Sequence, residues 1–457
     1  MKQPFKNNAK VRRAKQLLAQ ALREAQKDIR AVRGADPRQK ASCKKAMDTI
    51  AQQRGRPLFF PYIGSGAGNG ALVELADGSV KYDFITGIGV HYMGHSHPKL
   101  LEASIDAALE DIVMQGNLQF NAVSCDVTDR LVKIARLRGA GLKHCFLTSS
   151  GAMANENAFK LIFQKKSPAA RLLAFKNCFA GRTLTAVQMT DRPDYRRGLP
   201  RVLVVDHIPF FDPRNPKEST AESLRCLKRL LSRHKGQYAG MCFEMIQGEG
   251  GANPGDRKFF IALMEVLKKH RVAVMIDEIQ TFGRTTYPFA FQHFGLDKYV
   301  DVVTVGKMLQ FCATLFTAEY NPDPSLLSQT FTASSSALHA GKRILAEIMK
   351  GGYFGKTGKI IKLSQRFRAC LEKLAQEFPD RVKGPFGLGA MVGFTYADGS
   401  PEKVKQMIMK LYDNGLMSFT AGQKPARVRF LMPVGAVTPR DIDAACAIIR
   451  KTVMDLK

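Results

Sequence analysis

Residues 272–285 read VAVMIDEIQTFGRT, and residues 302–307 read VVTVGK. Each stretch begins with a short apolar run and reaches an ionisable group, Asp277 in the first and Lys307 in the second. Apolar runs of this length, without polar alternation, are typical of strands buried on both faces of a parallel sheet. Ligands of such sheets bind beyond the carboxyl ends of the strands, so Asp277 and Lys307 are candidate site residues.

Similar apolar runs recur through the middle of the chain, and helical patterns separate several of them. Strands that alternate with helices predict an α/β domain in which helices cover both faces of a mostly parallel sheet. We predict strands over residues 144–147, 172–175, 202–205, 240–245, 272–276 and 302–305, and helices over residues 219–232 and 257–270.

After about residue 340 the pattern changes to two longer helices, over 337–350 and 362–378, followed by short mixed elements. This change predicts a second, smaller α+β domain. Near the start of the chain, Asp77-Gly78 predicts a hairpin turn, and the Pro/Gly-rich residues 57–70 predict a loop. The domain prediction is a basic helical extension over 1–57, an N-terminal segment of the small domain over 58–100, a large domain over 101–336 and the C-terminal small domain over 337–457.

The chain is strongly basic, with 69 Lys and Arg residues against 40 Asp and Glu residues and a formal net charge of +29. Residues 1–57 contribute 16 of the basic and 4 of the acidic residues. A surplus of this size suits a protein that binds nucleic acid, yet no RNA-binding, zinc-finger or helix-turn-helix pattern accompanies it. Nucleic-acid binding is therefore not expected, although it stays open for residues 1–57.

Residues 11–32 place apolar side chains at steps of three and four, which predicts an amphipathic helix. We favour packing on a neighbouring domain or subunit over a membrane-surface or targeting role. No apolar run reaches the length of a membrane span, and the pattern of a secretory signal is missing. The nine cysteines are scattered, so neither a disulfide framework nor a zinc site is expected, and a cytoplasmic location is favoured.

Two further strand ends carry groups that complement Asp277 and Lys307. The strand over 144–147 runs into Thr148-Ser149-Ser150-Gly151, and hydroxyls with a glycine at a helix N-terminus bind anions. The strand over 172–175 leads to CFAGRT at residues 178–183. Together these stretches supply an anion cradle, a flat ring, a carboxylate and an amine, the set that pyridoxal phosphate requires. A structural ion pair of Asp277 with Lys307 is the alternative interpretation.

With these motifs in view, residues 72–450 resemble the class III pyridoxal-phosphate aminotransferases of the ornithine and acetylornithine type. The most specific stretches are GHSHP at 94–98, SSGAMANE at 149–156, FAGRT at 179–183, EMIQGEGG at 244–251, the Asp277–Gly283 region and Gly306-Lys307. These stretches follow one another along the chain in the same order as in the family. The resemblance implies fold type I, with a large domain that binds the cofactor and a smaller α+β domain.

The resemblance also implies roles around the cofactor. Lys307 would form the internal aldimine and move the proton, and Asp277 would keep the pyridine nitrogen protonated. Gln280 would bond the ring hydroxyl, Phe179 would stack on the ring, and Ser150, Gly151 and Ala152 would bind the phosphate. Thr330 matches the position that reaches the phosphate of the partner subunit, which implies a homodimer with shared active sites.

Three residues match substrate positions of the family. Arg182 would grip the distal carboxylate, and Arg429 would bind the carboxylate next to the reacting carbon. Glu249 matches the switch residue that neutralises that arginine while an ω-amine reacts and moves away when 2-oxoglutarate binds. The implied reaction transfers an amino group from lysine, ornithine or acetylornithine to 2-oxoglutarate. Residues 306–312 and 342–345 favour lysine 6-aminotransferase within the family.

Some features depart from the family pattern and keep alternatives open. Ala180 and Thr332-Ala333-Ser334 replace the usual residues beside the ring and the phosphate. An aminomutase or decarboxylase of the same fold, and a catalytically silent relative that binds polyanions, remain as alternatives. His95 and His97 have the spacing of a metal pair, but we favour a structural turn and expect no metal.

Overall fold

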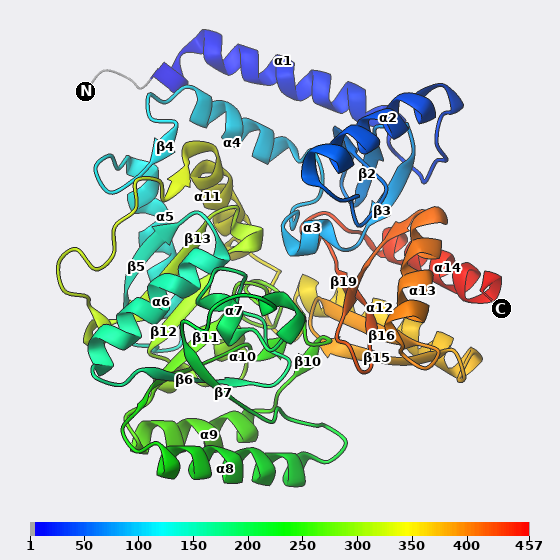
Figure 1. Cartoon of the computed structure of the whole chain (residues 1–457). Helices are drawn as coiled ribbons and strands as arrows, with labels where there is room; N and C mark the ends of the chain where they lie inside the picture. Colours follow the sequence, from blue (N-terminus) through cyan, green and yellow to red (C-terminus); the bar gives the residue numbers. More distant parts are fainter. Residues whose placement is uncertain (1–4, 457) are drawn as a thin grey trace. The chain divides into compact units, whose positions relative to one another are not determined.

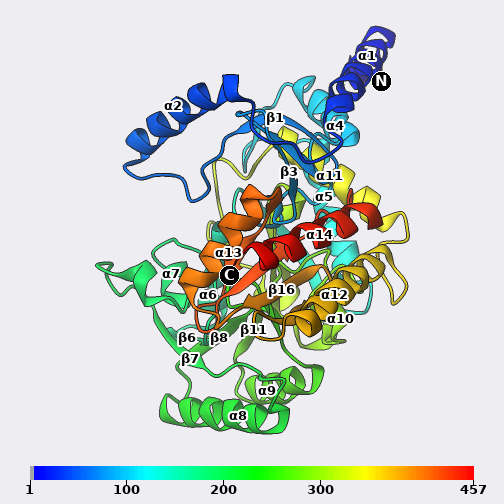
Figure 2. The same cartoon turned by 90° about the vertical axis from the view of Figure 1, so that its right-hand side faces the viewer.

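The computed structural model describes residues 5–456, apart from the side chain of Lys6, and these residues form two compact units. The first unit contains the residues up to Leu109, then Lys362–Phe386, and the residues from Val392 onward. The second unit contains Glu110–Ile361 and Gly387–Met391. Figures 1 and 2 show the elements of each unit.

The second unit is built on a seven-stranded sheet with the strand order β5-β13-β12-β11-β8-β6-β7. Only β13 runs opposite to the other strands, so the predicted mostly parallel sheet is confirmed. Every residue of β8, β11 and β12 is buried, as their continuous apolar sequences require. The strands are β5 (Leu142–Thr148), β6 (Arg171–Phe175), β7 (Val204–Ile208), β8 (Tyr238–Phe243), β11 (Ala273–Asp277), β12 (Val302–Val305) and β13 (Cys312–Thr317).

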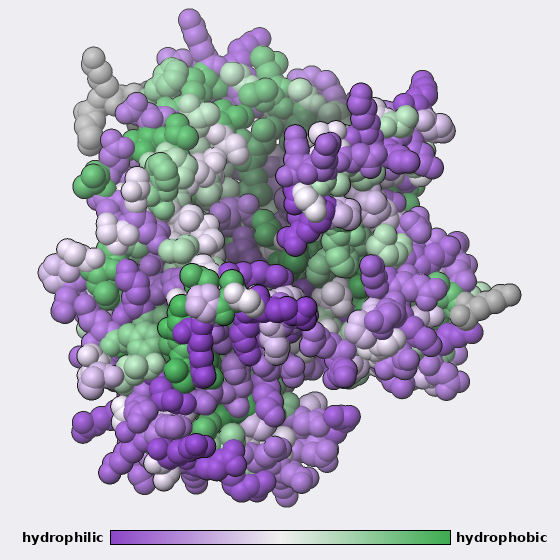
Figure 3. Space-filling model, in the orientation of Figure 1, coloured by the Kyte–Doolittle hydropathy of each residue, from purple (hydrophilic) through white to green (hydrophobic). Residues whose placement is uncertain are grey.

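Helices of the second unit follow the predicted pattern closely. The helix α8 (Pro216–Arg233) covers the prediction over 219–232, and α9 (Arg257–Lys269) covers the prediction over 257–270. The two helices pack side by side, and the face over them is strongly hydrophilic (Figure 3). The remaining long helices are α5 (Ala122–Ala135), α6 (Gly151–Lys166) and α11 (Ser335–Met349). Of these, α6 packs on the centre of the sheet, against β8, β11, β12 and β13.

The first unit combines two small sheets with helices. One sheet has the order β1-β2-β3-β17 and the other β15-β16-β19-β18. Its strands are β1 (Gly64–Asn69), β2 (Leu72–Leu75), β3 (Val80–Asp83), β15 (Val382–Leu388), β16 (Met391–Tyr396), β17 (Leu416–Met417), β18 (Phe419–Ala421) and β19 (Arg427–Leu431). Its helices include α4 (Pro98–Ala108), α12 (Lys359–Glu377), α13 (Pro401–Asp413) and α14 (Pro439–Asp455).

Residues 57–85 show one correct and one wrong prediction. The hairpin is confirmed, because β2 and β3 pair antiparallel around Asp77-Gly78. The loop prediction over 57–70 is wrong for its second half, where Gly64–Asn69 forms β1 against β2. Strand formation here depends on Gly68, since a Cβ atom at this position would lie 2.4 Å from the Cβ of His95. The glycine-rich stretch therefore allows a strand to lie close to His95 and does not form a flexible loop.

The N-terminal residues form two helices instead of one long helix. The predicted helix over 11–32 is present as α1 (Ala9–Ala25), which a 3₁₀ turn at Gln26–Asp28 ends early. The helix α1 packs on α4, and Lys15 pairs with Asp106 there. The second helix, α2 (Pro37–Arg54), was not predicted from the sequence. Within residues 5–456, no helix has the length and apolar character needed to cross a membrane.

The two histidines of the GHSHP stretch make structural contacts. The Nε2 atom of His95 lies 2.9 Å from Oδ2 of Asp83, whose other oxygen accepts the backbone N–H groups of Ile85 and Thr86. The Nδ1 atom of His97 accepts the N–H of Lys99 and caps α4. Among the described residues, no group of three or more His, Cys, Asp or Glu side chains could hold a metal ion.

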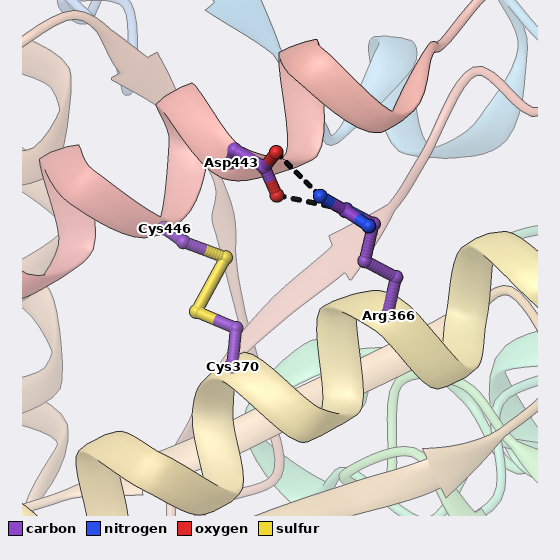
Figure 4. The surroundings of a disulfide bond; sticks show 4 residues. All are labelled: Arg366, Cys370, Asp443 and Cys446. Atoms are coloured by element: carbon purple, nitrogen blue, oxygen red, sulfur yellow. Dashed lines mark hydrogen bonds and ion pairs between the residues drawn. A yellow bond between two sulfur atoms is a disulfide. The ribbon is translucent and has the colours of Figure 1, made fainter.

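Cys370 and Cys446 form a disulfide between α12 and α14 in the first unit (Figure 4). Their Cα atoms lie 6.3 Å apart although 76 residues separate them in sequence. An ion pair of 2.6 Å between Arg366 and Asp443 lies beside the bond. The cysteine spacing, which suggested no disulfide framework, gave no sign of this single bond, because helix packing brings the two sulfur atoms together.

Loss of this disulfide is expected to destabilise the first unit by roughly 2–4 kcal/mol, because the cross-link restricts the unfolded chain. Cys446→Ser should lower the midpoint of thermal unfolding, and dithiothreitol should lower the wild-type midpoint to the same level. Cys125→Ser, which changes an exposed free cysteine, is the matched control. A wild-type midpoint that does not respond to dithiothreitol would contradict this prediction.

Candidate active site

The candidate site lies at the carboxyl edge of the sheet in the second unit. There β11 ends at Asp277, and β12, its parallel neighbour, leads through Gly306 to Lys307. Burial raises the pKa of Asp277 and that of Glu244, which follows the next strand, β8, and the positive charge of Lys307 opposes the rise in both. The edge thus gathers the amine and two carboxyl groups within electrostatic reach of one another, where ligands of parallel sheets bind.

Asp277 is buried and held by two hydrogen bonds. Its Oδ2 accepts from Nδ2 of Asn155 at 2.8 Å, and its Oδ1 accepts from the backbone N–H of Ile279 at 3.0 Å. Burial raises the pKa of Asp277, and these two hydrogen bonds and Lys307 oppose the rise. Because the charged form lacks solvent, a cation placed beside this carboxylate would be strongly favoured.

Asn155 fixes the orientation of that carboxylate. The hydroxyl of Thr304 on β12 donates to Oδ1 of Asn155 at 2.8 Å, so the amide nitrogen must face Asp277. The same nitrogen also donates to the carbonyl of Ala180 at 2.8 Å. One amide on α6 therefore connects β11, β12 and the loop after β6. The sequence motif at 149–156 included Asn155, but nothing in the sequence assigned it this role.

Lys307 stands in a tight and partly strained turn. Its φ is 49°, in the left-handed region that non-glycine residues rarely adopt. A Cβ atom on the preceding Gly306 would lie 2.5 Å from Sγ of Cys312, so only glycine allows this close approach. The backbone of Lys307 is therefore placed firmly beside Cys312, whose pKa burial raises to about 11.

The first turn of α6 meets the loop after β6. Ser150 caps the helix, since its Oγ accepts the N–H of Met153 at 3.3 Å. Gly181 has a φ of 125°, and a Cβ atom there would lie 2.9 Å from the Cβ of Ala152. Gly181 of the FAGRT loop thus approaches Ala152 in the first turn of α6, where the backbone N–H groups have no partners inside the helix. This is the geometry of an anion cradle.

Glu244 connects two segments around the site. Its carboxyl group accepts the backbone N–H of Phe179 at 3.1 Å and that of Gly248 at 2.8 Å. The side chain of the buried Gln280 lies directly against Gly248, where a Cβ atom would lie 2.1 Å from Oε1 of Gln280. Phe179 and Gln280 are thereby positioned at the same edge as Asp277. Burial and the nearby Asp277 raise the pKa of Glu244 to about 8.

Arg182 lies at the exposed border of this site. Its guanidinium carbon lies 3.8 Å from the ring centroid of Tyr195, a residue that the sequence gave no reason to select. Thr183, the next residue, donates to Glu156 on α6 and so ties the loop to that helix. Glu249 also belongs to this unit and lies 3.9 Å from Arg192.

The two remaining predicted site residues are Arg429 and Thr330. Arg429 is fully buried on β19 in the first unit. Thr330 is exposed, next to the exposed Phe331. Its neighbour Gln329 accepts a hydrogen bond of 2.8 Å from the hydroxyl of Thr148, at the end of β5.

The residues at the sheet edge fit pyridoxal phosphate on structural grounds. A buried carboxylate suits a protonated ring nitrogen, and the glycines at 181, 248 and 306 let the surrounding segments pack closely at this edge. The N–H groups at the start of α6 suit a phosphate. Lys307 supplies an amine on the strand next to the carboxylate.

Comparisons with known proteins point to one family. The family model described as aminotransferase class-III matches residues 54–453. The acetylornithine aminotransferase of Methanocaldococcus jannaschii is 28% identical over 407 residues, which cover 85% of this chain and 93% of that protein. The enzyme of the same name from Bacillus subtilis is 29% identical over 394 residues, 84% of this chain and 93% of that protein.

Solved structures with this fold include two aminotransferases. Lysine aminotransferase from M. tuberculosis in the internal aldimine form has a TM-score of 0.78 and 24% sequence identity, covering 90% of this chain and all of that one. Ornithine aminotransferase from Toxoplasma gondii has a TM-score of 0.77 and 22% identity, covering 90% and 95% of the two chains. These two likenesses establish the fold.

Glu244 is expected to give the cofactor-free protein a specific pH dependence of stability. Its pKa is about 8 in the folded state and close to 4.5 when exposed, so the folded state keeps a proton that the unfolded chain loses. The contribution to stability is complete below about pH 4.5 and is lost as the pH rises through about 8. Glu244→Gln should therefore flatten the fall in the free energy of unfolding, measured in urea between about pH 5 and about pH 8.

Glu222→Gln, at an exposed position on α8, is the control and should leave the slope unchanged. Equal slopes for Glu244→Gln and the wild type would show that the buried carboxyl group does not titrate in this way.

Proposed function

The chain belongs to the class III aminotransferases, which are pyridoxal-phosphate-dependent enzymes of fold type I, and on that premise we propose that it transfers an amino group from a diamino acid to 2-oxoglutarate. The donor is lysine, ornithine or acetylornithine. The observation that carries the proposal is that Lys307 and the buried, doubly hydrogen-bonded Asp277 lie at the ends of adjacent parallel strands. The names of the relatives support this class of donor.

When bound, pyridoxal phosphate supplies an aldehyde that condenses with amines and a ring that withdraws electrons from the neighbouring carbon. The residues of this chain position that chemistry. Asp277 holds a proton on the ring nitrogen, and Asn155 keeps its carboxylate aimed in one direction. Ser150, Gly151 and Ala152 hold the phosphate, while Phe179 covers the ring and Gln280 binds its hydroxyl group.

Lys307 has two tasks in this proposal. Its Nζ atom would hold the cofactor when no substrate is present, and it would move the proton of the reacting carbon during transfer. The turn around Gly306 fixes the backbone from which the amine reaches. Asp277 and Glu244 are buried away from water, and in such low-dielectric surroundings charge on Nζ has a strong effect.

Substrate carboxylates are recognised by arginines in the proposal. Arg182 binds the distal carboxylate and Arg429 the carboxylate next to the reacting carbon, because a guanidinium holds a carboxylate through two parallel hydrogen bonds. Glu249 neutralises Arg429 while the ω-amine of the donor reacts. It leaves that arginine when 2-oxoglutarate, with two carboxylates, takes the donor's place.

The enzyme is proposed to act as a homodimer with shared sites, and an apolar patch supports this. The pairing of β4 (Met114–Gln115) with β14 (Ala333–Ser334) brings two segments together, and a Cβ atom on Gly116 would lie 1.8 Å from the carbonyl oxygen of Thr330. Exposed apolar side chains border this contact, and a second copy would cover them. They are Val113 (73% exposed), Leu118 (98%), Phe120 (56%) and Phe331 (58%).

Lys307→Ala is expected to reduce glutamate formation from 2-oxoglutarate about a thousandfold or more with lysine, ornithine or acetylornithine as donor. Borohydride treatment of the wild type should fix the cofactor on the peptide that contains Lys307, as read by mass spectrometry. Lys298→Ala, at an exposed lysine, is the control and should retain activity. If the wild type forms no glutamate with any of the three donors, the proposed function is wrong.

Leu118→Glu is expected to convert a dimer into a monomer, because a charge in the apolar patch would be buried without a partner. Light scattering during size-exclusion chromatography measures the mass directly. Leu137→Glu changes a leucine of similar exposure to Phe120 outside these segments and should leave the dimer intact. A dimeric Leu118→Glu variant would place the subunit interface elsewhere.

A further inference from the structure

Glu249 has an arginine next to it within its own unit. Nη1 of Arg192 lies 3.9 Å from Oε1 of Glu249, and the two side chains are only 18% and 22% exposed. Both residues belong to the second unit, so their proximity does not depend on the placement of the first unit, which carries Arg429. An ion pair shielded from water to this extent is screened less by salt than a surface pair.

The position of Arg192 is well determined by its surroundings. Its guanidinium lies 4.6 Å from the ring centroid of Tyr195, and its Nε lies 3.4 Å from Oδ1 of Asp194. Arg182 approaches the same tyrosine ring at 3.8 Å. Tyr195 thus contacts both the arginine beside Glu249 and the arginine assigned to the distal carboxylate. Cations at these distances are attracted to the ring face.

The segment that carries Arg192 is anchored to the cofactor site. Nη1 of Arg196 donates to the carbonyl of Thr190 at 2.9 Å. The hydroxyl of Thr190 donates to the carbonyl of Gly181 and accepts from the N–H of Ala180, both at 3.0 Å. Residues 190–196 therefore form one connected piece with the FAGRT loop, and the backbone that carries Arg192 cannot move far from that loop without breaking these bonds.

We propose that Arg192 is a positioning residue that holds the carboxylate of Glu249 while Arg429 is occupied by a substrate carboxylate. This inference rests on the proposed function, in which Glu249 must leave Arg429 for 2-oxoglutarate to bind. Moving a half-buried carboxylate away from its cation costs free energy unless a second cation pairs with it. Arg192 receives it and so lowers the cost of opening the acceptor site. Donor binding, in which Glu249 stays with Arg429, does not use this contact.

The test separates the two half-reactions. Arg192→Gln is expected to raise the KM for 2-oxoglutarate about five- to tenfold, with kcat and the rate of the donor half-reaction changed less than about twofold. Arg192→Lys, which keeps the charge, should recover part of the loss. Arg197→Gln removes a charge from an exposed position on the same segment and is the matched control. Equal losses in both half-reactions would overturn the proposal.

A double-mutant cycle identifies Glu249 as the partner. In a Glu249→Gln background, Arg192→Gln should change the KM for 2-oxoglutarate by less than about twofold, because the carboxylate that it holds is gone. Calorimetric titration of the holoenzyme with glutarate, a dicarboxylate that cannot react, should show weaker binding after Arg192→Gln only when Glu249 is present. Additive effects of the two substitutions, by either measurement, would overturn the proposal.

Failure of the function and failure of the inference give different results. A wild type that makes glutamate from 2-oxoglutarate, together with an Arg192→Gln variant that has the wild-type KM, overturns the inference alone. A wild type that makes no glutamate with any donor overturns the proposed function and the inference with it.

Discussion

The site depends on one chain of hydrogen bonds that is buried beneath the sheet edge. Thr304 on β12 orients Asn155 on α6, and Asn155 in turn holds Asp277 at the end of β11. Removal of one member would leave a buried polar group without its partner, which is costly in a low-dielectric interior. The two strands that carry the carboxylate and the lysine are thus locked to the helix whose first turn forms the anion cradle. Thr304, Asn155 and Asp277 therefore belong both to the buried core and to the candidate site.

Close backbone approaches, in addition to the hydrogen bonds, fix the loops around the site. Gly181 touches the start of α6, Gly248 leaves space for Gln280, and Gly306 lies against Cys312. Each of these contacts would be blocked by a single methyl group. The loops around the site are therefore packed as tightly as a protein core, which suits a site that must hold a flat, charged ligand in one orientation.

Much of this architecture can be predicted from the sequence, because buried parallel strands have continuous apolar runs and their ends carry the functional groups. The strand prediction at 172–175 and the helix prediction at 257–270 match the observed elements to within one residue. The helix α2 was missed because Cys43 is its only buried residue, so its sequence has no clear apolar stripe. The Cys370–Cys446 bond and the contact of Arg192 with Glu249 were missed for another reason. Tertiary packing alone joins residues so far apart in the chain.

The direction of β13 has a consequence for the lysine. Because β13 runs against β12, with Val305 opposite Ala313, the segment between them is the end of a hairpin rather than the start of a long crossover. The backbone N–H of Gln310 donates to the carbonyl of Lys307 at 3.0 Å and closes the turn. The backbone of Lys307 is thus held on both sides. Its amine can reach only as far as the four methylene groups of the side chain allow. The length of one side chain therefore sets how far this amine can reach.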